Sequence, residues 1–159
     1  MSDALFQIAE PGESRVKETC VTGRVVGIDL GTTNSLVATV VAGVPRAIPV
    51  DDDGDLLLPS VVEYFAGGGG PLVGREALGH APDRPRDVIV SVKRFMGRGP
   101  DDPELTRRFT PYRFAEGAGP IVRFRVAESA EGAAREVTPI EVSAEILKVL
   151  RARAEAELD

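Results

Sequence analysis

The segment Val25–Val41 (VVGIDLGTTNSLVATVV) constrains the fold more than any other part of this chain. Two apolar runs rich in valine flank a short polar stretch, Gly31–Ser35. Runs of this kind, bounded by turn residues, predict two β-strands joined as a hairpin. Asp29 interrupts the first run at its C-terminal end, where a buried carboxylate without a partner would be costly. We therefore expect Asp29 to face a ligand pocket beside the turn.

The composition of this turn suits a phosphate group. Gly31 lets the backbone approach a ligand closely, and the N–H groups of Thr32, Thr33 and Asn34 can form an anion-binding concavity. Asp29 suits Mg²⁺, which keeps most of its waters beside phosphates and needs few carboxylates, so we expect it to act through water. A plain tight hairpin, with Asp29 only capping it, explains the same residues without any ligand.

Two common nucleotide loops are excluded here, because a strand follows the turn and neither G-x-x-x-x-G-K-[ST] nor G-x-G-x-x-G occurs. Instead, Gly27–Ser35 (GIDLGTTNS) closely resembles the first phosphate motif of the heat-shock-70 (DnaK-type) chaperones, members of the actin-like ATPase superfamily. The resemblance implies ATP or ADP with Mg²⁺ as ligands. It also implies an α/β fold, an actin-like (ribonuclease H-like) lobe with a mixed β-sheet and flanking helices, incomplete, plus a small peripheral subdomain.

Residues 1–23 mix acids, bases, proline and glycine without sustained periodicity, which predicts a flexible N-terminal extension. Residues 24–159 are then expected to form the N-terminal portion of the nucleotide-binding domain, that is, a truncated first lobe. Within the extension, Ala4–Gly12 (ALFQIAEPG) resembles the N-terminal signature of the HscA subtype, the heat-shock-70 chaperones of iron–sulfur cluster assembly.

Composition narrows the classes of function. A chain of 159 residues, 43% hydrophobic and 28% charged, fits one ordinary globular domain. Its single cysteine, Cys20, excludes an internal disulfide and a familiar zinc site. The net charge of −6 argues against nucleic acid or an anionic membrane as a partner. With no apolar stretch of about 18 to 20 residues and no signal sequence, we expect a soluble, cytoplasmic protein.

A second informative block is Val88–Arg98 (VIVSVKRFMGR), whose apolar spacing predicts a short helix ended by Gly97. The block resembles the family's segment with Lys-Arg, two apolar residues and Gly-Arg. In that family the lysine reaches the γ-phosphate region and helps to orient the attacking water, a role that suits a compact cation. The resemblance assigns this catalytic role to Lys93. By composition alone, Lys93 and Arg94 are more simply a solvated pair on an amphipathic helix.

The segments between these blocks predict further strands and loops. A strand is expected at Val44–Val50, followed by a solvated acidic loop at Asp51–Asp55. Pro59–Val62 resembles a strand of the heat-shock-70 family and, with Leu72–Gly74, would form further strands. His80 is the only histidine and receives no functional role.

Arginines alternate with apolar residues in the C-terminal half of the chain. This alternation predicts strands of a half-exposed sheet in the segments 112–114, 121–126 and 135–137. A basic surface that binds nucleic acid would show the same alternation, but the acidic chain favours the half-exposed sheet. The resemblance to the heat-shock-70 family implies that this sheet is the small peripheral subdomain of the first lobe.

The last helix has a clear beginning. Thr138, Pro139 and Glu141 provide an N-cap, a proline at the first helical position and a capping-box glutamate. The apolar residues expected along its buried face are Ile140, Leu147, Leu150, Ala154 and Leu158. Such a helix is expected to pack within the domain, although a partner-binding helix would have the same pattern.

The resemblance runs from Ala4 to Asp159 but covers only the first part of a heat-shock-70 chaperone. It implies the ATP-binding portion of an HscA-like chaperone, with a client protein, a J-domain co-chaperone and an iron–sulfur scaffold protein as partners. Because both lobes position the phosphates, the isolated chain is expected to be a poor ATPase. Two alternatives stay open: a sugar-kinase relative with the actin-like fold, and a noncatalytic truncated interaction module.

Overall fold

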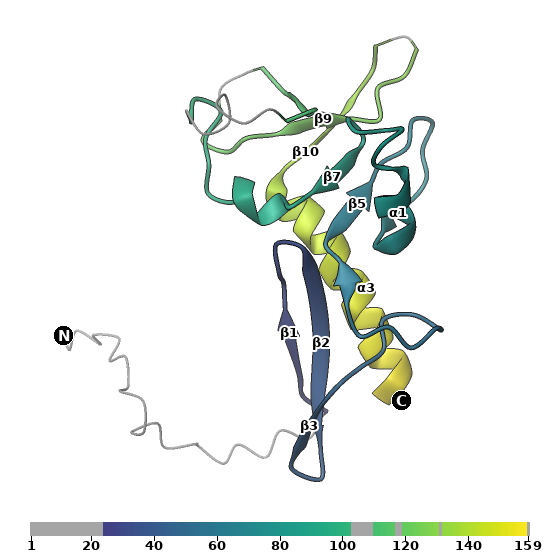
Figure 1. Cartoon of the computed structure of the whole chain (residues 1–159). Coiled ribbons are helices and arrows are strands. Elements are labelled where there is room, and N and C mark those ends of the chain that lie inside the picture. The colour runs from purple at the N-terminus through teal and green to yellow at the C-terminus, as the bar shows by residue number, and fades with distance from the viewer. Residues whose placement is uncertain (1–23, 103–109, 117–118, 131, 159) are drawn as a thin grey trace, which may run out of the picture.

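The computed structural model describes residues 24–102, 110–116, 119–130 and 132–158. The predicted N-terminal extension, with its HscA-like motif, lies outside the described residues. In chain order the elements are β1 (Val26–Asp29), β2 (Asn34–Val41), β3 (Val44–Ala47), β4 (Leu58–Pro59), β5 (Val61–Glu63), β6 (Leu72–Val73), α1 (Arg75–His80), β7 (Val88–Val90), the 3₁₀ helix η1 (Val92–Phe95), β8 (Arg113–Phe114), β9 (Phe124–Val126), β10 (Arg135–Val137) and α3 (Pro139–Leu158) (Figure 1).

The first sheet is built around the predicted hairpin. Strands β1, β2 and β3 pair in that order, and β4 pairs with the start of β2. The β2–β3 turn has positive φ at both Ala42 and Gly43, 50° and 80°, the geometry that fits the twist of a two-residue hairpin. The predicted third strand, Val44–Val50, is shorter than expected and ends at Ala47.

Two further sheets of three strands have the orders β6-β5-β7 and β10-β9-β8. The α/β fold class of an incomplete lobe is confirmed. All strand pairs among the described residues are antiparallel, so the parallel component of the expected mixed sheet does not occur within them.

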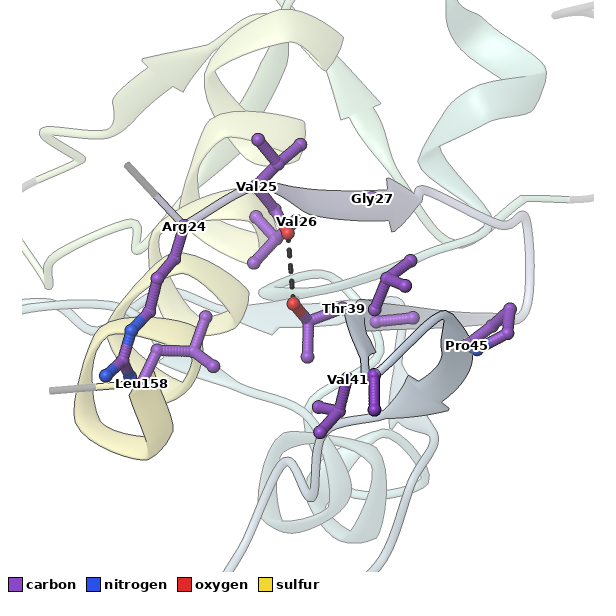
Figure 2. A pocket seen from close by; sticks show the side chains of 11 residues that line it. Arg24, Val25, Val26, Gly27, Thr39, Val41, Pro45 and Leu158 are labelled. Carbon is purple, nitrogen blue, oxygen red and sulfur yellow. Dashed lines mark hydrogen bonds between the residues drawn. The ribbon is translucent and has the colours of Figure 1, made fainter. Parts of the chain in front are cut away.

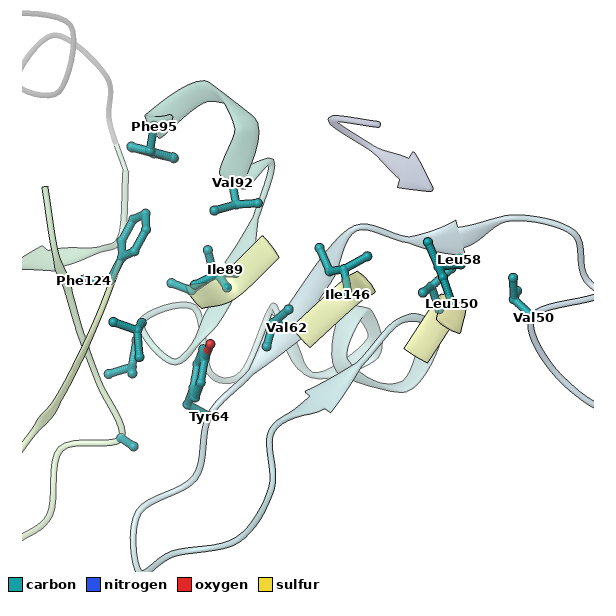
Figure 3. Packing of buried hydrophobic residues seen from close by; sticks show 14 of the residues in the cluster. Val50, Leu58, Val62, Tyr64, Ile89, Val92, Phe95, Phe124, Ile146 and Leu150 are labelled. Carbon is teal, nitrogen blue, oxygen red and sulfur yellow. The ribbon is translucent and has the colours of Figure 1, made fainter. Parts of the chain in front are cut away.

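The long helix α3 joins these parts into one core. It packs against β2, β5, β6 and η1, and Figure 1 shows it running along the molecule beside the sheets. Its Ile146 and Leu150 are completely buried in one cluster with Leu58, Val62 and Ile89 (Figure 3). Each of these side chains contributes about 1.5–3 kcal/mol on burial, so their packing holds α3 against strands of the first two sheets.

The buried face of α3 differs from the predicted one. Val142, Ile146, Leu150 and Ala154 recur at every fourth position and are buried, whereas Ile140 is 59% exposed. Of the five residues predicted for this face, Leu150 and Ala154 are buried, Leu158 packs against the core, and Ile140 and Leu147 are exposed. The two wrong assignments follow a seven-residue spacing, which drifts around a straight helix.

The predicted capping box of α3 is present. The N–H and Oγ1 of Thr138 donate to the Glu141 carboxylate at 2.7 and 2.8 Å, and the Glu141 N–H donates back to Thr138 Oγ1 at 3.2 Å. The bond from the Thr138 backbone N–H, and after it the bond from the Thr138 hydroxyl, hold the pKa of Glu141 below its usual value.

We expect Glu141→Gln to lower the free energy of unfolding at pH 7 by roughly 0.5–1 kcal/mol. Because the pKa of Glu141 is lower in the folded state, its contribution is present above pH 4.5 and is lost as the pH falls through the folded-state pKa. Urea unfolding at pH 7 and below pH 4.5 measures this change. The control, Glu157→Gln at the exposed C-terminal end of α3, should show no such loss.

The block around Lys93 folds differently from the prediction of one short helix. Val88–Val90 form strand β7, paired with β5, and only Val92–Phe95 form a helical turn, η1. Ser91 separates the two with a left-handed backbone, φ 54° and ψ 38°. The prediction was wrong for the first half because three β-branched residues meet a partner strand that lies more than 20 residues earlier.

His80 ends α1, and it has a partner that the sequence did not suggest. Its Nδ1 lies 2.6 Å from a carboxylate oxygen of Glu63, which is completely buried, and Arg84 donates to the other oxygen at 2.8 Å. A buried carboxylate needs such partners. His80 therefore has a structural role in closing the β5–α1 corner.

The predicted half-exposed sheet is confirmed in β8–β10. Phe124 and Val126 face the core, while Arg125 alternates with them. Arg113 and Arg125 both pair with Glu128, at 2.5 and 3.7 Å. Because both arginines pair with the same carboxylate, Glu128 balances one of their two positive charges within the sheet. In the part of the chain that the structure describes, no helix has the length and apolar character required to cross a membrane.

Candidate phosphate-binding turn

The candidate site is the turn that closes the β1–β2 hairpin. β1 ends at Asp29 and β2 begins at Asn34, so the turn itself is 30–33. The predicted turn, Gly31–Ser35, was too long at its end, because Asn34 and Ser35 belong to β2. Asp29 lies opposite Leu36, the last pair of the ladder. The hairpin therefore presents the predicted residues together at one end of the sheet, the end that points toward η1 in Figure 1.

The turn depends on glycine at position 31. A Cβ added to Gly31 would lie 1.9 Å from the carbonyl oxygen of Asn34, a distance that no real Cβ contact reaches. The glycine is required by this close backbone approach rather than by a positive φ angle. Any larger residue must open the turn.

Two buried serines hold the turn from behind. The Gly31 N–H donates to Ser35 Oγ at 3.2 Å, and Ser60 Oγ donates to the Gly31 carbonyl at 2.9 Å. The two hydroxyls lie 2.8 Å apart, and both side chains are 1% exposed. The Ser60 N–H also donates to the Thr33 carbonyl at 2.8 Å.

The outer side of the turn is open. Thr33 and Asn34 are exposed and Thr32 is half-buried. The N–H groups of Thr32 and Thr33 donate to no other residue of the described ranges. Unpaired amides beside a glycine turn can bind phosphate oxygens, which is the chemistry the sequence predicts.

Asp29 is exposed at the end of β1, and the expectation that it faces a ligand pocket stays a prediction. No group of three or more potential metal-ligating side chains occurs within the described residues. A single exposed carboxylate next to free amides nevertheless fits Mg²⁺ held through water beside phosphates, because such a site uses few protein ligands. The assignment of Asp29 remains a proposal.

Lys93 lies on η1 with its side chain exposed. The buried Phe95 fixes η1 through edge contacts with Phe124 and Tyr112, with ring centroids 5.0 and 5.8 Å apart. The left-handed Ser91 costs of order 1–3 kcal/mol, and strain of this kind is often found at functional sites. α3 packs against both η1 and β2, so one helix braces the two elements that carry the candidate residues.

Two apolar hollows lie beside β1 and share Val26 and Leu158 in their linings, but neither is lined by the turn or by Lys93. Figure 2 shows the first, with Val25, Val41, Pro45 and Leu158 around Thr39, whose hydroxyl donates to the Val25 carbonyl at 3.0 Å. The second lies between β1 and α3, beside Leu147, Ala154 and Leu158. The candidate residues thus lie outside both hollows, on the open surface of the described part of the chain.

The comparisons decide the family. Residues 25–159 match the sequence model of the family described as "Hsp70 protein". The chain belongs to the Hsp70 family. This Hsp70-family chain is 48% identical, over 98% of its length, to a "Chaperone protein HscA homolog" of Laribacter hongkongensis, and 47% identical, over 98%, to that of Burkholderia multivorans. A third such homologue, from Bordetella petrii, is 47% identical over 96%.

The chain spans 23% of the length of the Laribacter and Burkholderia relatives and 22% of that from Bordetella, and it corresponds to their N-terminal part. The predicted family and HscA subtype resemblance are therefore confirmed.

The sequence did not predict that Ser35 and Ser60 hold the turn through hydrogen bonds to Gly31. A signal existed for Ser35: strand residues alternate between faces, and Ser35 shares the parity of Val37, which is completely buried. A serine on the buried face needs a polar partner. Nothing local to Ser60 identifies it as that partner, because 25 residues separate the two serines.

Proposed function

We propose that the chain is the phosphate-binding portion of an HscA-type ATP-dependent chaperone. The observation that carries the proposal is the pair of unpartnered N–H groups at Thr32 and Thr33, on a turn fixed by Gly31. The Hsp70 family membership supplies the ligand: ATP or ADP with Mg²⁺. The resemblance to the HscA subtype adds the proposed partners, which are a client protein, a J-domain co-chaperone and an iron–sulfur scaffold protein. The proposed location is the cytoplasm.

Each residue has a separate task in this proposal. The amides of Thr32, Thr33 and Asn34 bind phosphate oxygens, and the threonine hydroxyls add donors. Asp29 holds a water of Mg²⁺, and the ion, when bound, neutralises part of the phosphate charge. Lys93 approaches the γ-phosphate from η1 and stabilises the charge that redistributes during hydrolysis.

The chaperone proposal is favoured over a sugar-kinase relative, because the HscA homologues match nearly the whole chain. A noncatalytic interaction module is favoured by one observation, which is that neither hollow beside β1 encloses the turn. The two experiments below separate these cases.

Thr32→Val and Thr33→Val together should weaken Mg·ATP binding about 10–100-fold, because they remove two hydroxyl donors while keeping side-chain volume. The measurement is calorimetric titration of a chimera in which residues 1–159 replace the matching N-terminal segment of the Laribacter homologue, hereafter the chimera. Thr39→Val is the control, since its hydroxyl bonds Val25 away from the turn. Equal affinities in both variants would contradict the assignment.

The 159-residue chain alone should hydrolyse ATP negligibly, and the chimera should hydrolyse it. An open half-site leaves the phosphates solvated and the attacking water unpositioned. Phosphate release under single-turnover conditions, with chain in excess over ATP, measures both. Turnover by the chain equal to that of the chimera would show that the site is complete within residues 1–159.

A further inference from the structure

We propose that Ser35 and Ser60 form a clamp that positions the phosphate turn, and that Ser60 sets the direction of its N–H groups. The inference rests on the proposed phosphate-binding role of the turn. In this proposal the two serines position the turn without touching the phosphate. The proposal follows from their hydrogen bonds to Gly31 and from the contact between their hydroxyls.

The proton positions in the clamp follow from chemistry. A carbonyl oxygen can only accept, so the Ser60 hydroxyl must donate its proton to Gly31. Ser60 Oγ then has only lone pairs for its contact with Ser35, so Ser35 must be the donor across the 2.8 Å between the hydroxyls. Ser35 Oγ in turn accepts from the Gly31 N–H. The three bonds close a ring in which each serine donates once and accepts once.

Ser60 also acts on the next peptide units of the turn. Its hydroxyl binds the carbonyl of Gly31, and its N–H binds the carbonyl of Thr33. In a trans peptide unit the C=O and the following N–H point in opposite directions, and no cis peptide occurs among the described residues. Drawing these two carbonyls toward Ser60 therefore aims the N–H groups of Thr32 and Asn34 away from it.

Burial makes the clamp rigid. Both serines are 1% exposed, so water does not compete for their hydroxyls. Gly31 has no room to shift toward Asn34, because the backbone there is already in close contact. Ser60 itself is fixed between β4 and β5, both of which are paired strands. The turn is thus held from the sheet side and open only on the side where a phosphate would bind.

The first test needs no ligand. Amide hydrogen exchange of the 159-residue chain, read by NMR, should show the Gly31 N–H exchanging about fivefold or more faster in Ser60→Ala, since Ser35 loses the partner that orients it. Ser143→Ala is the matched control: its hydroxyl is equally buried and bonds a carbonyl, that of Pro139, within α3. It should leave the exchange of Gly31 unchanged.

A cysteine separates hydrogen bonding from packing. Ser60→Cys fills the space of the serine but donates weakly, so it should resemble Ser60→Ala in the exchange of Gly31. Wild-type exchange in Ser60→Cys or in Ser60→Ala, with both variants folded, would overturn the clamp.

The second test adds Mg·ATP to the same chain and follows the Thr32 and Asn34 amides, which Ser60 is inferred to orient, together with that of Thr33. Wild type and Ser143→Ala should give the same saturable shifts, and Ser60→Ala should raise the Kd about fivefold or more. If wild type shows no shifts while the exchange result holds, the clamp stands and the phosphate-binding role falls. If all three chains bind with equal Kd, the clamp does not position the turn for phosphate and the inference is overturned.

Discussion

Gly31→Ala should lower the melting temperature of this chain by roughly 5–10 °C and abolish Mg·ATP binding in the chimera. The added Cβ would lie 1.9 Å from the Asn34 carbonyl oxygen, so the turn has to open. Opening breaks the bonds of Gly31 to Ser35 and Ser60, and it costs two buried hydroxyl groups a hydrogen-bond partner. We expect a loss of at least about 2 kcal/mol in the free energy of unfolding.

The control for this substitution lies four residues earlier, within strand β1. A Cβ added to Gly27 meets no atom within 4 Å, and the backbone of Gly27 does not have a positive φ. Gly27→Ala should therefore be neutral or stabilise by up to about 1 kcal/mol, through the unfolded state. Thermal denaturation followed by circular dichroism compares the two. Equal melting temperatures would mean that the turn adapts to a side chain at position 31.

The elements that the sequence predicted well are those determined by nearby residues. The β1–β2 hairpin has its turn residues and both strands within 17 residues, and the N-terminus of α3 is specified by Thr138, Pro139 and Glu141. Local patterns of this kind need no knowledge of the rest of the fold.

The elements predicted poorly depend on distant partners. The residues of β7 can form a strand or a helix by their own pattern, and β5 decides for the strand. The exposure of Ile140 is decided by which side of α3 the sheets cover. The role of His80 depends on Glu63, which lies 17 residues earlier in the chain. The Glu63 side chain is completely buried, which is unusual for a carboxylate and could not be expected from the sequence.

The candidate site shows the same division. Gly31, Thr32 and Thr33 are recognisable from the motif, because a phosphate turn is a local structure. The second anchor, Ser60, comes from the junction of β4 and β5 and could not be identified without the fold. Lys93 is recognisable only through the family resemblance, and its position on a 3₁₀ turn instead of a helix follows from the end of β7 at Val90.

Lys93→Ala in the chimera should lower the single-turnover rate of ATP hydrolysis about 10²–10³-fold and change the ATP affinity by less than about threefold. The phosphates of bound ATP are already held by the turn amides and Mg²⁺ in the proposed site. A further ammonium near the γ-phosphate therefore gains most when charge redistributes in the transition state. Because Lys93 is exposed on η1, its removal leaves the buried Phe95 and the fold in place.

Arg94→Ala is the matched control, since Arg94 is the neighbouring residue on η1, is equally exposed and carries the same charge. A rate close to wild type in Arg94→Ala, together with the loss in Lys93→Ala, separates a positioned ammonium from the general field of two cations. Lys93→Arg should not restore the rate, because a planar guanidinium cannot occupy the position of a compact charge. If Lys93→Ala and Arg94→Ala have equal rates, Lys93 is a solvated lysine and the catalytic cation lies elsewhere.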